Sequence, residues 1–277
     1  GTSIPERMAR QERQIFSLTE EQCRLLNFLG SRKQVLIEGC AGSGKTVMAV
    51  KKTRQFAREG KKVLLLAYNR LIAENLAFCL ADLAPDVEVG TYHQFCLDRL
   101  REAGQEVKVP PNAGAAFWKE QVPERFDALI KTAALAYDAV IVDEGQDFHC
   151  EYWLTIEQLV GPEGYFYIFY DPQQNLYGSP LEFPIAGPPF VLQENCRTTR
   201  AIFQTLRQHA ERAMAIRDEA PEGEPVRTLV ARSARQQQKH LASLLHELVN
   251  QSHVSPQRIV ILGGHSLKHT SLGGTVQ

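Results

Sequence analysis

One octapeptide, Gly39-Cys40-Ala41-Gly42-Ser43-Gly44-Lys45-Thr46, matches the phosphate-binding pattern GxxxxGK(S/T). An apolar run, Gln34–Glu38, precedes it, and a helix-forming run from Lys45 to about Glu59 follows it. The glycines allow the backbone to approach a phosphate closely, and amides at the start of the helix bind phosphate oxygens. Lys45 would place its charge on the terminal phosphates of ATP, and the Thr46 hydroxyl would be a ligand of Mg²⁺.

Another apolar run ends in two acids, Val140-Ile141-Val142-Asp143-Glu144. In a parallel sheet the carboxyl ends of all strands lie at one edge, so these acids would face the phosphate loop. Asp143 would hold Mg²⁺, and Glu144 would polarise the attacking water as a general base. ATP and Mg²⁺ are therefore the expected cofactors.

Short apolar runs alternate with helical patterns along most of the chain. Thr19 is the expected N-cap of a first helix, and Phe56, Phe78 and Phe203 occur at helical spacing and are expected in the core. The predicted strands are Gln34–Glu38, Lys62–Ala67, Val87–Val89, Ala139–Val142 and Tyr165–Tyr170, and the later helices are Lys45–Glu59, Arg70–Leu83 and Thr199–Ile216. This alternation predicts an α/β fold with a parallel sheet flanked by helices.

The pattern also suggests domain boundaries. Residues 1–17 form a lead-in, and 18–219 form the ATP-binding domain, interrupted by a small insertion at 97–136. A Pro/Gly-containing stretch at 220–225 is the expected linker. Residues 226–277 then form one β-α-β unit, with strands at Val226–Val230 and Arg258–Leu262, which begins a second, truncated domain.

Composition narrows the possible classes of protein. Of 277 residues, 44% are hydrophobic and 23% are charged, so a sizeable core is possible. No apolar stretch approaches the roughly 20 residues that a membrane span needs, so no membrane partner is expected. The six cysteines are scattered without a CxxC pair, and a reducing cytoplasm is the simplest compartment.

The net charge of −1 hides an uneven distribution. Residues 1–79 carry a net charge of +7, residues 80–190 of −12, and residues 191–277 of +4. A basic face could attract a nucleic-acid backbone, and ordinary solvated helix faces account for the pattern equally well.

Six further stretches, in chain order, resemble the motifs of superfamily 1 helicases of the UvrD/Rep type. The box Asp143-Glu144-Gly145-Gln146-Asp147 resembles that family's DEAQD, with Gly in place of Ala. The others are Leu18–Gln22 (Q motif), Tyr68–Arg70 (Asn-basic pair), Gly90–Cys96 (TFHSF), Asp171–Tyr177 (GDxxQSIY) and Leu192–Thr199 (LxxNYRS). The amino-acid sequence around Leu18–Asn75 resembles the UvrD-like helicase part of chains that also carry a nuclease-related N-terminal domain.

The resemblance implies a P-loop NTPase with a RecA-like sheet, completed in cis by a second RecA-like domain. It implies that Gln22 binds the adenine edge and that Gln146 positions water or relays the nucleotide state. Gln174 would sense the terminal phosphate, and Arg197 would contact the γ-phosphate in the transition state. With Lys45 and Glu144, these last two form the expected catalytic set.

The resemblance also implies contacts with single-stranded DNA or with single/double-strand junctions. Thr91, Tyr92 and His93 would lie near the strand, as would Asn69, and Tyr177 could stack on a base. Three of the residues in these boxes could instead have a purely structural role. Gln22 could belong to a capping box, His93 could be a structural hydrogen-bonding residue, and Tyr177 could pack within a loop.

Three departures from the family pattern affect the functional prediction. Cys196 replaces the Tyr that stacks on adenine, the Trp expected after Tyr177 is missing, and the later motifs do not occur in the 277 residues. The first hypothesis is therefore the ATP-binding and hydrolysing core of a DNA helicase, which would lack unwinding activity as this fragment alone. The alternative is a nucleotide-dependent interaction or switch module without unwinding activity.

Overall fold

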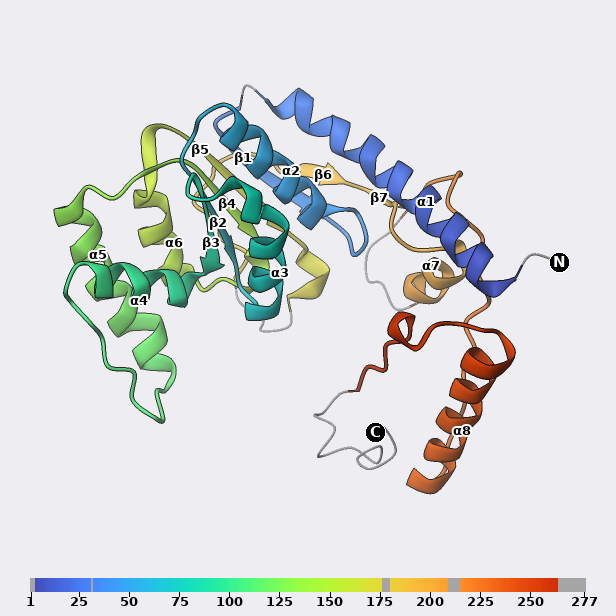
Figure 1. The fold of residues 1–277 in the computed structure, drawn as a ribbon. Helices are drawn as coiled ribbons and strands as arrows, with labels where there is room; N and C mark the ends of the chain where they lie inside the picture. Colours follow the sequence, from blue (N-terminus) through green and yellow to red (C-terminus); the bar gives the residue numbers. More distant parts are fainter. Residues whose placement is uncertain (1–2, 31, 176–179, 209–214, 264–277) are drawn as a thin grey trace.

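The computed structural model describes residues 3–30, 32–175, 180–208 and 215–263. Its centre is a six-stranded sheet in the order β3-β2-β4-β5-β1-β6, in which every pair of neighbours is parallel (Figure 1). The strands are β1 Gln34–Gly39, β2 Val63–Ala67, β3 Val87–Thr91, β4 Tyr137–Asp143, β5 Val160–Tyr170 and β6 Phe190–Leu192. The expected α/β fold is confirmed: a RecA-like parallel sheet of a P-loop protein, flanked by helices.

Helices cover both faces of the sheet because its strands are apolar on both sides. In β2, Leu64 and Leu66 belong to one buried cluster, whereas Val63 and Leu65 belong to the other. The first cluster includes side chains of α4 (Tyr92–Glu102), α5 (Val122–Ala133) and α6 (Cys150–Gln158); the second includes those of α2 (Lys45–Arg58), α3 (Arg70–Leu80) and the 3₁₀ turn Arg24–Leu29.

The segment 97–136 helps to build the core. It comprises the second half of α4, a π-helical turn at Phe117–Gln121 and helix α5. Phe126, Leu129 and Ile130 of α5 are buried in the cluster that also contains α6. The segment therefore forms the helical layer that connects β3 to β4.

The N-terminal helix starts earlier than predicted. Helix α1 spans Ile4–Cys23, and Ser3 and Glu6 form a capping box at its start. Thr19 is consequently not an N-cap: it lies within the helix, and its hydroxyl donates to the carbonyl of Ile15 at 2.9 Å. The expectation failed because a complete Ser-x-x-Glu box, with a proline in the first turn, occurs upstream.

The predicted helix Thr199–Ile216 is also wrong in extent. Helix α7 spans only Arg200–Arg207, capped by Thr199. Ala215 and Ile216 form a short strand, β8, parallel to β7 (Glu194–Asn195). Pairing with β7 satisfies backbone groups that a longer helix would otherwise have used.

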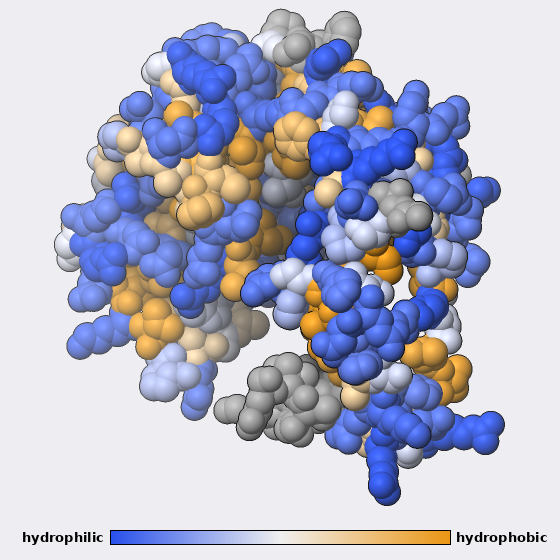
Figure 2. All heavy atoms as spheres, turned by 45° about the vertical axis from the view of Figure 1, so that its right-hand side comes forward, coloured by the Kyte–Doolittle hydropathy of each residue, from blue (hydrophilic) through white to orange (hydrophobic). Residues whose placement is uncertain are grey.

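The expected β-α-β unit after residue 225 lacks its two strands. Helix α8 (Ala234–His246) is present, but no strand is found in the described residues 226–263. Val230, Val260 and Leu262 are exposed, and Figure 2 shows apolar side chains at the surface of this C-terminal part, at the lower right. Two short strands form a stable sheet only with further strands or a packed face, which these residues lack.

The phenylalanine predictions were partly wrong. Phe56 and Phe203 are buried as expected, but Phe78 is 84% exposed. The face of α3 that packs on the sheet is instead formed by Ala73, Leu76 and Leu80, and Phe78 lies outside this stripe. Among the described helices, none is long and apolar enough to cross a membrane.

Replacing Phe126 should reveal how much α5 contributes to the core. Phe126 is 0% exposed, so Phe126→Ala should lower the free energy of unfolding by about 3–5 kcal/mol through lost burial and a cavity. Phe78→Ala is the matched control and should change it by less than about 0.5 kcal/mol. Urea denaturation measures both, and equal losses would contradict this division of roles.

Candidate active site

The carboxyl ends of four strands converge on one edge of the sheet. Residues 40–46 follow β1, Glu144 follows β4, Asp171 follows β5 and residues 193–198 follow β6 or lie in β7. The chain leaves β1 for β2 on one side and reaches β6 on the other, so the strand order reverses next to β1. Ligands of open parallel sheets bind at such a reversal.

The phosphate loop adopts backbone conformations that require glycine. Gly42 and Gly44 have φ angles of 76° and 88°, in the left-handed region that disfavours a β-carbon. Helix α2 begins directly after Gly44. Its N-terminus and the loop therefore form the expected anion-binding cradle.

Lys45 is held at the loop by three acceptors. Its Nζ donates to the carbonyls of Gly39 at 2.8 Å and Cys40 at 3.2 Å, and it lies 3.3 Å from Oδ2 of Asp171. The side chains of Lys45 and Asp171 are 6% and 1% exposed. Removing one partner of such a buried ion pair leaves an uncompensated charge, so the pair is strongly constrained.

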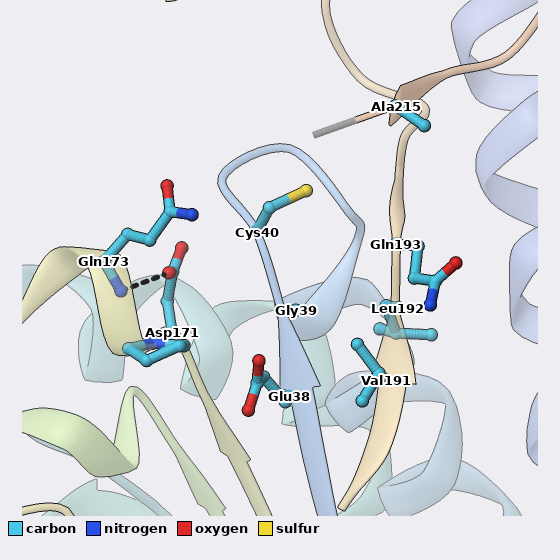
Figure 3. A pocket seen from close by; sticks show the side chains of 10 residues that line it. Glu38, Gly39, Cys40, Asp171, Gln173, Val191, Leu192, Gln193 and Ala215 are labelled. Atoms are coloured by element: carbon cyan, nitrogen blue, oxygen red, sulfur yellow. Dashed lines mark hydrogen bonds between the residues drawn. The ribbon is translucent and has the colours of Figure 1, made fainter. Parts of the chain in front are cut away.

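Asp171 also organises the segment that follows β5. Its Oδ1 accepts from the Gln173 amide at 3.0 Å, as Figure 3 shows, and its Oδ2 accepts from Nε2 of Gln174 at 2.7 Å. Gln174, predicted to sense the terminal phosphate, is thus bonded to the same carboxylate as Lys45. Beside them lies a cavity of about 390 Å³ lined by the ends of β1, β5 and β6 and by Ala215, a volume typical of small-molecule sites.

Asp143 is fully buried, and neither of its carboxylate oxygens has a hydrogen-bond partner among the described residues. Burial and, secondarily, the charge of Glu144 raise the pKa of Asp143 to about 6, against opposing effects of Thr46 and Lys45. A buried carboxylate needs a partner or a metal. Oxygen ligands such as these and the Thr46 hydroxyl suit Mg²⁺, so the residues present fit the predicted ion.

Glu144 has a strained backbone. Its φ and ψ angles are 56° and 46°, and a left-handed non-glycine residue costs about 1–3 kcal/mol. Its Oε2 accepts from Nε2 of Gln146 at 2.8 Å, and Oε1 of Gln146 accepts from the Asp171 amide at 3.0 Å. A β-carbon on Gly145 would lie 2.6 Å from Cγ2 of Ile168, so this position has little room for a side chain.

The residues expected at the nucleotide base lie on α1 and after β7. Gln22 is 2% exposed, and its Oε1 has no partner among the described residues. It lies in the last part of α1, far from the capping box at Ser3, so it is not itself a capping residue. Cys196 is buried, and its Sγ lies 3.6 Å from the carbonyl of Gly42, so it packs on the phosphate loop.

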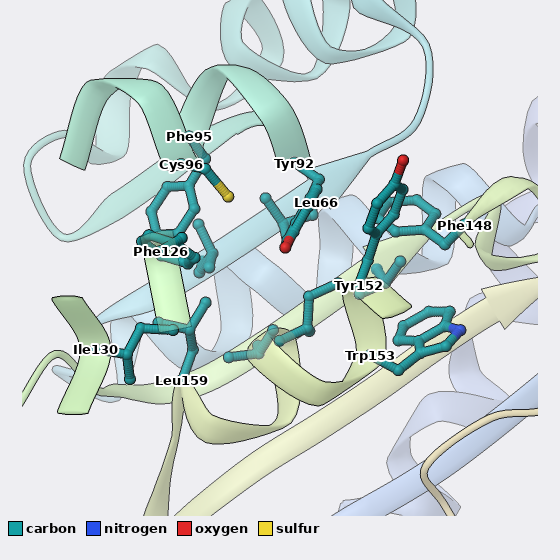
Figure 4. Close-up of a cluster of buried hydrophobic side chains, with 14 of the residues drawn as sticks. Leu66, Tyr92, Phe95, Cys96, Phe126, Ile130, Phe148, Tyr152, Trp153 and Leu159 are labelled. Atoms are coloured by element: carbon teal, nitrogen blue, oxygen red, sulfur yellow. The ribbon is translucent and has the colours of Figure 1, made fainter. Parts of the chain in front are cut away.

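Two residues predicted to contact DNA lie largely inside the protein. Tyr92 is 3% exposed, its hydroxyl bonds Thr155 at 2.6 Å, and its ring stacks on Tyr152, as Figure 4 shows. The ring and the hydroxyl of Tyr92 are therefore engaged inside the protein, and its predicted position near a DNA strand stays a prediction. His93 is half-buried, and its Nε2 lies 3.1 Å from both Trp118 O and Tyr152 Oη; burial lowers its pKa.

The remaining predicted DNA contacts lie at helix starts or outside the described residues. The side chain of Asn69 caps α3 by accepting from the Leu71 amide, and that of Thr91 caps α4. Asn69 is exposed, so its nitrogen can still reach a ligand. Tyr177 lies outside the described residues.

Two residues of this site had no predicted role. Asp171 and Asn195 are both fully buried, and each bonds groups from separate segments. Asp171 opens one of the boxes described in the sequence, and Asn195 lies in the middle of another. The hydrogen-bond partners of Asp171 and Asn195 lie in loops that are distant in the chain. A local sequence pattern does not show that these loops lie side by side.

Asp143→Asn should stabilise the nucleotide-free protein at neutral pH. The pKa of Asp143 is raised from 3.8 to about 6, so the native state binds more protons than the unfolded chain between about pH 4 and 6. The ionised group therefore destabilises the native state above this window, and stability recovers as the pH falls. Asparagine should raise the free energy of unfolding at pH 7.5 by up to about 3 kcal/mol.

Denaturation at several pH values measures this effect. The advantage of the variant should vanish below about pH 4. Asp86→Asn, at an exposed carboxylate, is the control and should show no such dependence. An advantage of Asp143→Asn that is constant with pH would show that the buried charge is not its source.

Comparison with known proteins places this site in a family. A solved structure described as the crystal structure of Bacteroides Pif1 bound to ssDNA is 19% identical, with a TM-score of 0.30, covering 60% of this chain and 33% of that one. The chain thus spans about a third of that structure's length. Comparison with curated proteins finds no match. The family model described as an AAA domain (AAA_19) matches residues 24–180, more than half of the chain, and the chain therefore belongs to that family.

Proposed function

We propose that this chain is the ATP-binding and hydrolysing core of a UvrD/Rep-type DNA helicase. In the whole protein, hydrolysis would be coupled to translocation along single-stranded DNA and to duplex unwinding. The observation that supports this best is the hydrogen-bonded chain from Lys45 through Asp171 and Gln146 to Glu144. It joins the group that would bind the phosphates to the group that would activate water.

We infer the following roles for the residues of this site. Lys45 would exchange its carbonyl partners for phosphate oxygens, since an ammonium group has three donors. Glu144 would accept the proton of the attacking water, held in place by Nε2 of Gln146 at 2.8 Å. Gln174 would report the terminal phosphate to Asp171, and Arg197 would stabilise charge that develops on the γ-phosphate.

The metal would be held by Asp143 and Thr46. Bound Mg²⁺ neutralises charge on the phosphate oxygens. It would also pair the buried Asp143 carboxylate, whose oxygens lack partners among the described residues. Gln22 would bind the adenine edge through its Oε1, which has no hydrogen-bond partner in the described part of the chain.

We also propose the domain organisation that the sequence suggested, with residues 18–219 as the ATP-binding domain, 220–225 as linker and 226–277 as the start of a second RecA-like domain. The described residues 226–263 contribute helix α8 and no strand to that second domain. The amide of Arg200 donates to the carbonyl of Pro221, and that of Ala201 donates to the carbonyl of Glu222. The first linker residues are thus attached to α7. The remainder of the second domain, in cis, and single-stranded DNA are the proposed partners.

A nucleotide-dependent switch module without unwinding activity is the second candidate. One observation favours it: the side chain of Tyr92 is buried, and those of Asn69 and Thr91 already cap helices. These three predicted DNA contacts therefore have side chains that already make contacts within the protein. In this case the ATP site would control binding of another protein.

Glu144→Gln separates nucleotide binding from hydrolysis. Glutamine keeps an oxygen that can accept from Gln146, but it cannot take a proton from water, so turnover should fall by about 10²–10⁴-fold. Lys45→Ala is the contrasting variant and should lose affinity for ATP, as calorimetry would measure. Normal turnover of Glu144→Gln would refute the general-base role, and unchanged ATP affinity of Lys45→Ala would refute the phosphate site.

Single-stranded DNA distinguishes the two candidate functions. If the protein is a helicase core, oligo-dT should stimulate its ATPase activity, and the stimulation should weaken steeply with salt because phosphate contacts release counterions. Heparin of matched charge is the control for a nonspecific polyanion effect, and Lys45→Ala is the background control. ATPase activity that ignores oligo-dT would favour the switch module.

A further inference from the structure

The side chain of Asn195 connects two segments that are 154 residues apart. Its Nδ2 donates to the carbonyl of Ala41 in the phosphate loop at 2.8 Å. Its Oδ1 accepts, each at 3.0 Å, from the amide of Arg197, the amide of Thr198 and the hydroxyl of Thr198. One carboxamide thus holds the phosphate loop with one end and the turn that carries Arg197 with the other.

The backbone next to Asn195 strengthens this connection. The amide of Cys196 donates to the carbonyl of Gly42 at 3.1 Å. A β-carbon on Gly42 would lie 2.5 Å from Nδ2 of Asn195, so only glycine leaves room for the carboxamide. The phosphate loop and the Arg197 turn are therefore fitted to each other at this point.

Asn195 is 0% exposed. A buried carboxamide that lacks hydrogen-bond partners costs free energy. The four hydrogen bonds of Asn195 therefore hold its side chain in this position. The guanidinium of Arg197, in contrast, belongs to an exposed residue. The backbone of Arg197 is thus held in place, whereas its side chain is exposed. This arrangement suits an arginine that must reach a ligand from a fixed position.

We propose that Asn195 is a positioning residue that aims Arg197 at the terminal phosphate by tying the Arg197 turn to the phosphate loop. The inference rests on the proposed ATPase function and deepens it. Asn195 does not touch the reacting atoms; it sets the distance between Arg197 and a nucleotide cradled by residues 39–46. Its effect should therefore appear with a γ-phosphate and be absent with ADP.

Asn195→Asp tests this connection with little change of shape. Aspartate keeps the oxygen that accepts from Arg197 and Thr198, but its second oxygen would face the carbonyl of Ala41 without a proton to donate. The turn should survive and the link to the loop should be lost. Asn195→Ser is the second variant, since its hydroxyl can accept from the same turn amides but is too short to reach Ala41.

Calorimetry on the full chain compares ATPγS with ADP, both with Mg²⁺. In Asn195→Asp and Asn195→Ser, affinity for ATPγS should fall roughly five- to 150-fold, as expected for one lost and one unpaired polar contact, while ADP affinity stays within about twofold. Thr198→Val is the matched control, because it removes one bond to Oδ1 and leaves the link to Ala41 intact. It should keep the wild-type preference for ATPγS.

Arg197→Ala provides the decisive background. If Asn195 acts through Arg197, Asn195→Asp should cause no further loss of ATPγS affinity when Arg197 is already alanine. Equal ATPγS/ADP affinity ratios in wild type and Asn195→Asp, or full additivity with Arg197→Ala, would overturn the proposal. Failure of the wild type to bind either nucleotide would instead overturn the proposed function itself.

Discussion

Parallel pairing of the central strands is the constraint on which the site depends. Because β1, β4 and β5 all run in one direction, Lys45, Glu144 and Asp171 meet at one edge of the sheet although they are far apart in the chain. Register matters as much as direction: Ala67 pairs with Asp143, and Glu38 pairs with Tyr170. A slip of one residue in β4 would turn Asp143 towards the opposite face and away from Thr46.

The site is built from groups that the fold alone would not favour. Asp143 is buried without a hydrogen-bond partner among the described residues, and Glu144 has left-handed backbone angles. Both features cost stability in the absence of a ligand, and the apolar layers on the two faces of the sheet offset that cost. Because a bound metal would pair Asp143, part of the cost would be returned when Mg²⁺ and nucleotide bind.

The sequence predicts those elements that are specified by residues close together in the chain. β2 was predictable because Val63–Ala67 is uniformly apolar and buried, and the phosphate loop because its glycines adopt the backbone that its pattern requires. Where the outcome depends on tertiary contacts, prediction failed. Val226–Val230 has the composition of a strand but finds no partner strand among the described residues. Likewise, the box that contains Tyr92 does not indicate that the tyrosine hydroxyl bonds Thr155 on α6. The links made by Asp171 and Asn195 could not be foreseen for the same reason.

Asp171 and Asn195 both contact the phosphate loop, and the two contacts differ in chemistry. Asp171 acts on the loop through Lys45, whose ammonium has only three donors, all engaged with Gly39, Cys40 and Asp171. If a phosphate binds here as proposed, some of these bonds must be exchanged, so this attachment would change with the nucleotide. Asn195 uses the carbonyl of Ala41, which a phosphate would not displace because both are hydrogen-bond acceptors. Under the proposed function, the attachment through Lys45 would respond to nucleotide and the attachment through Asn195 would persist.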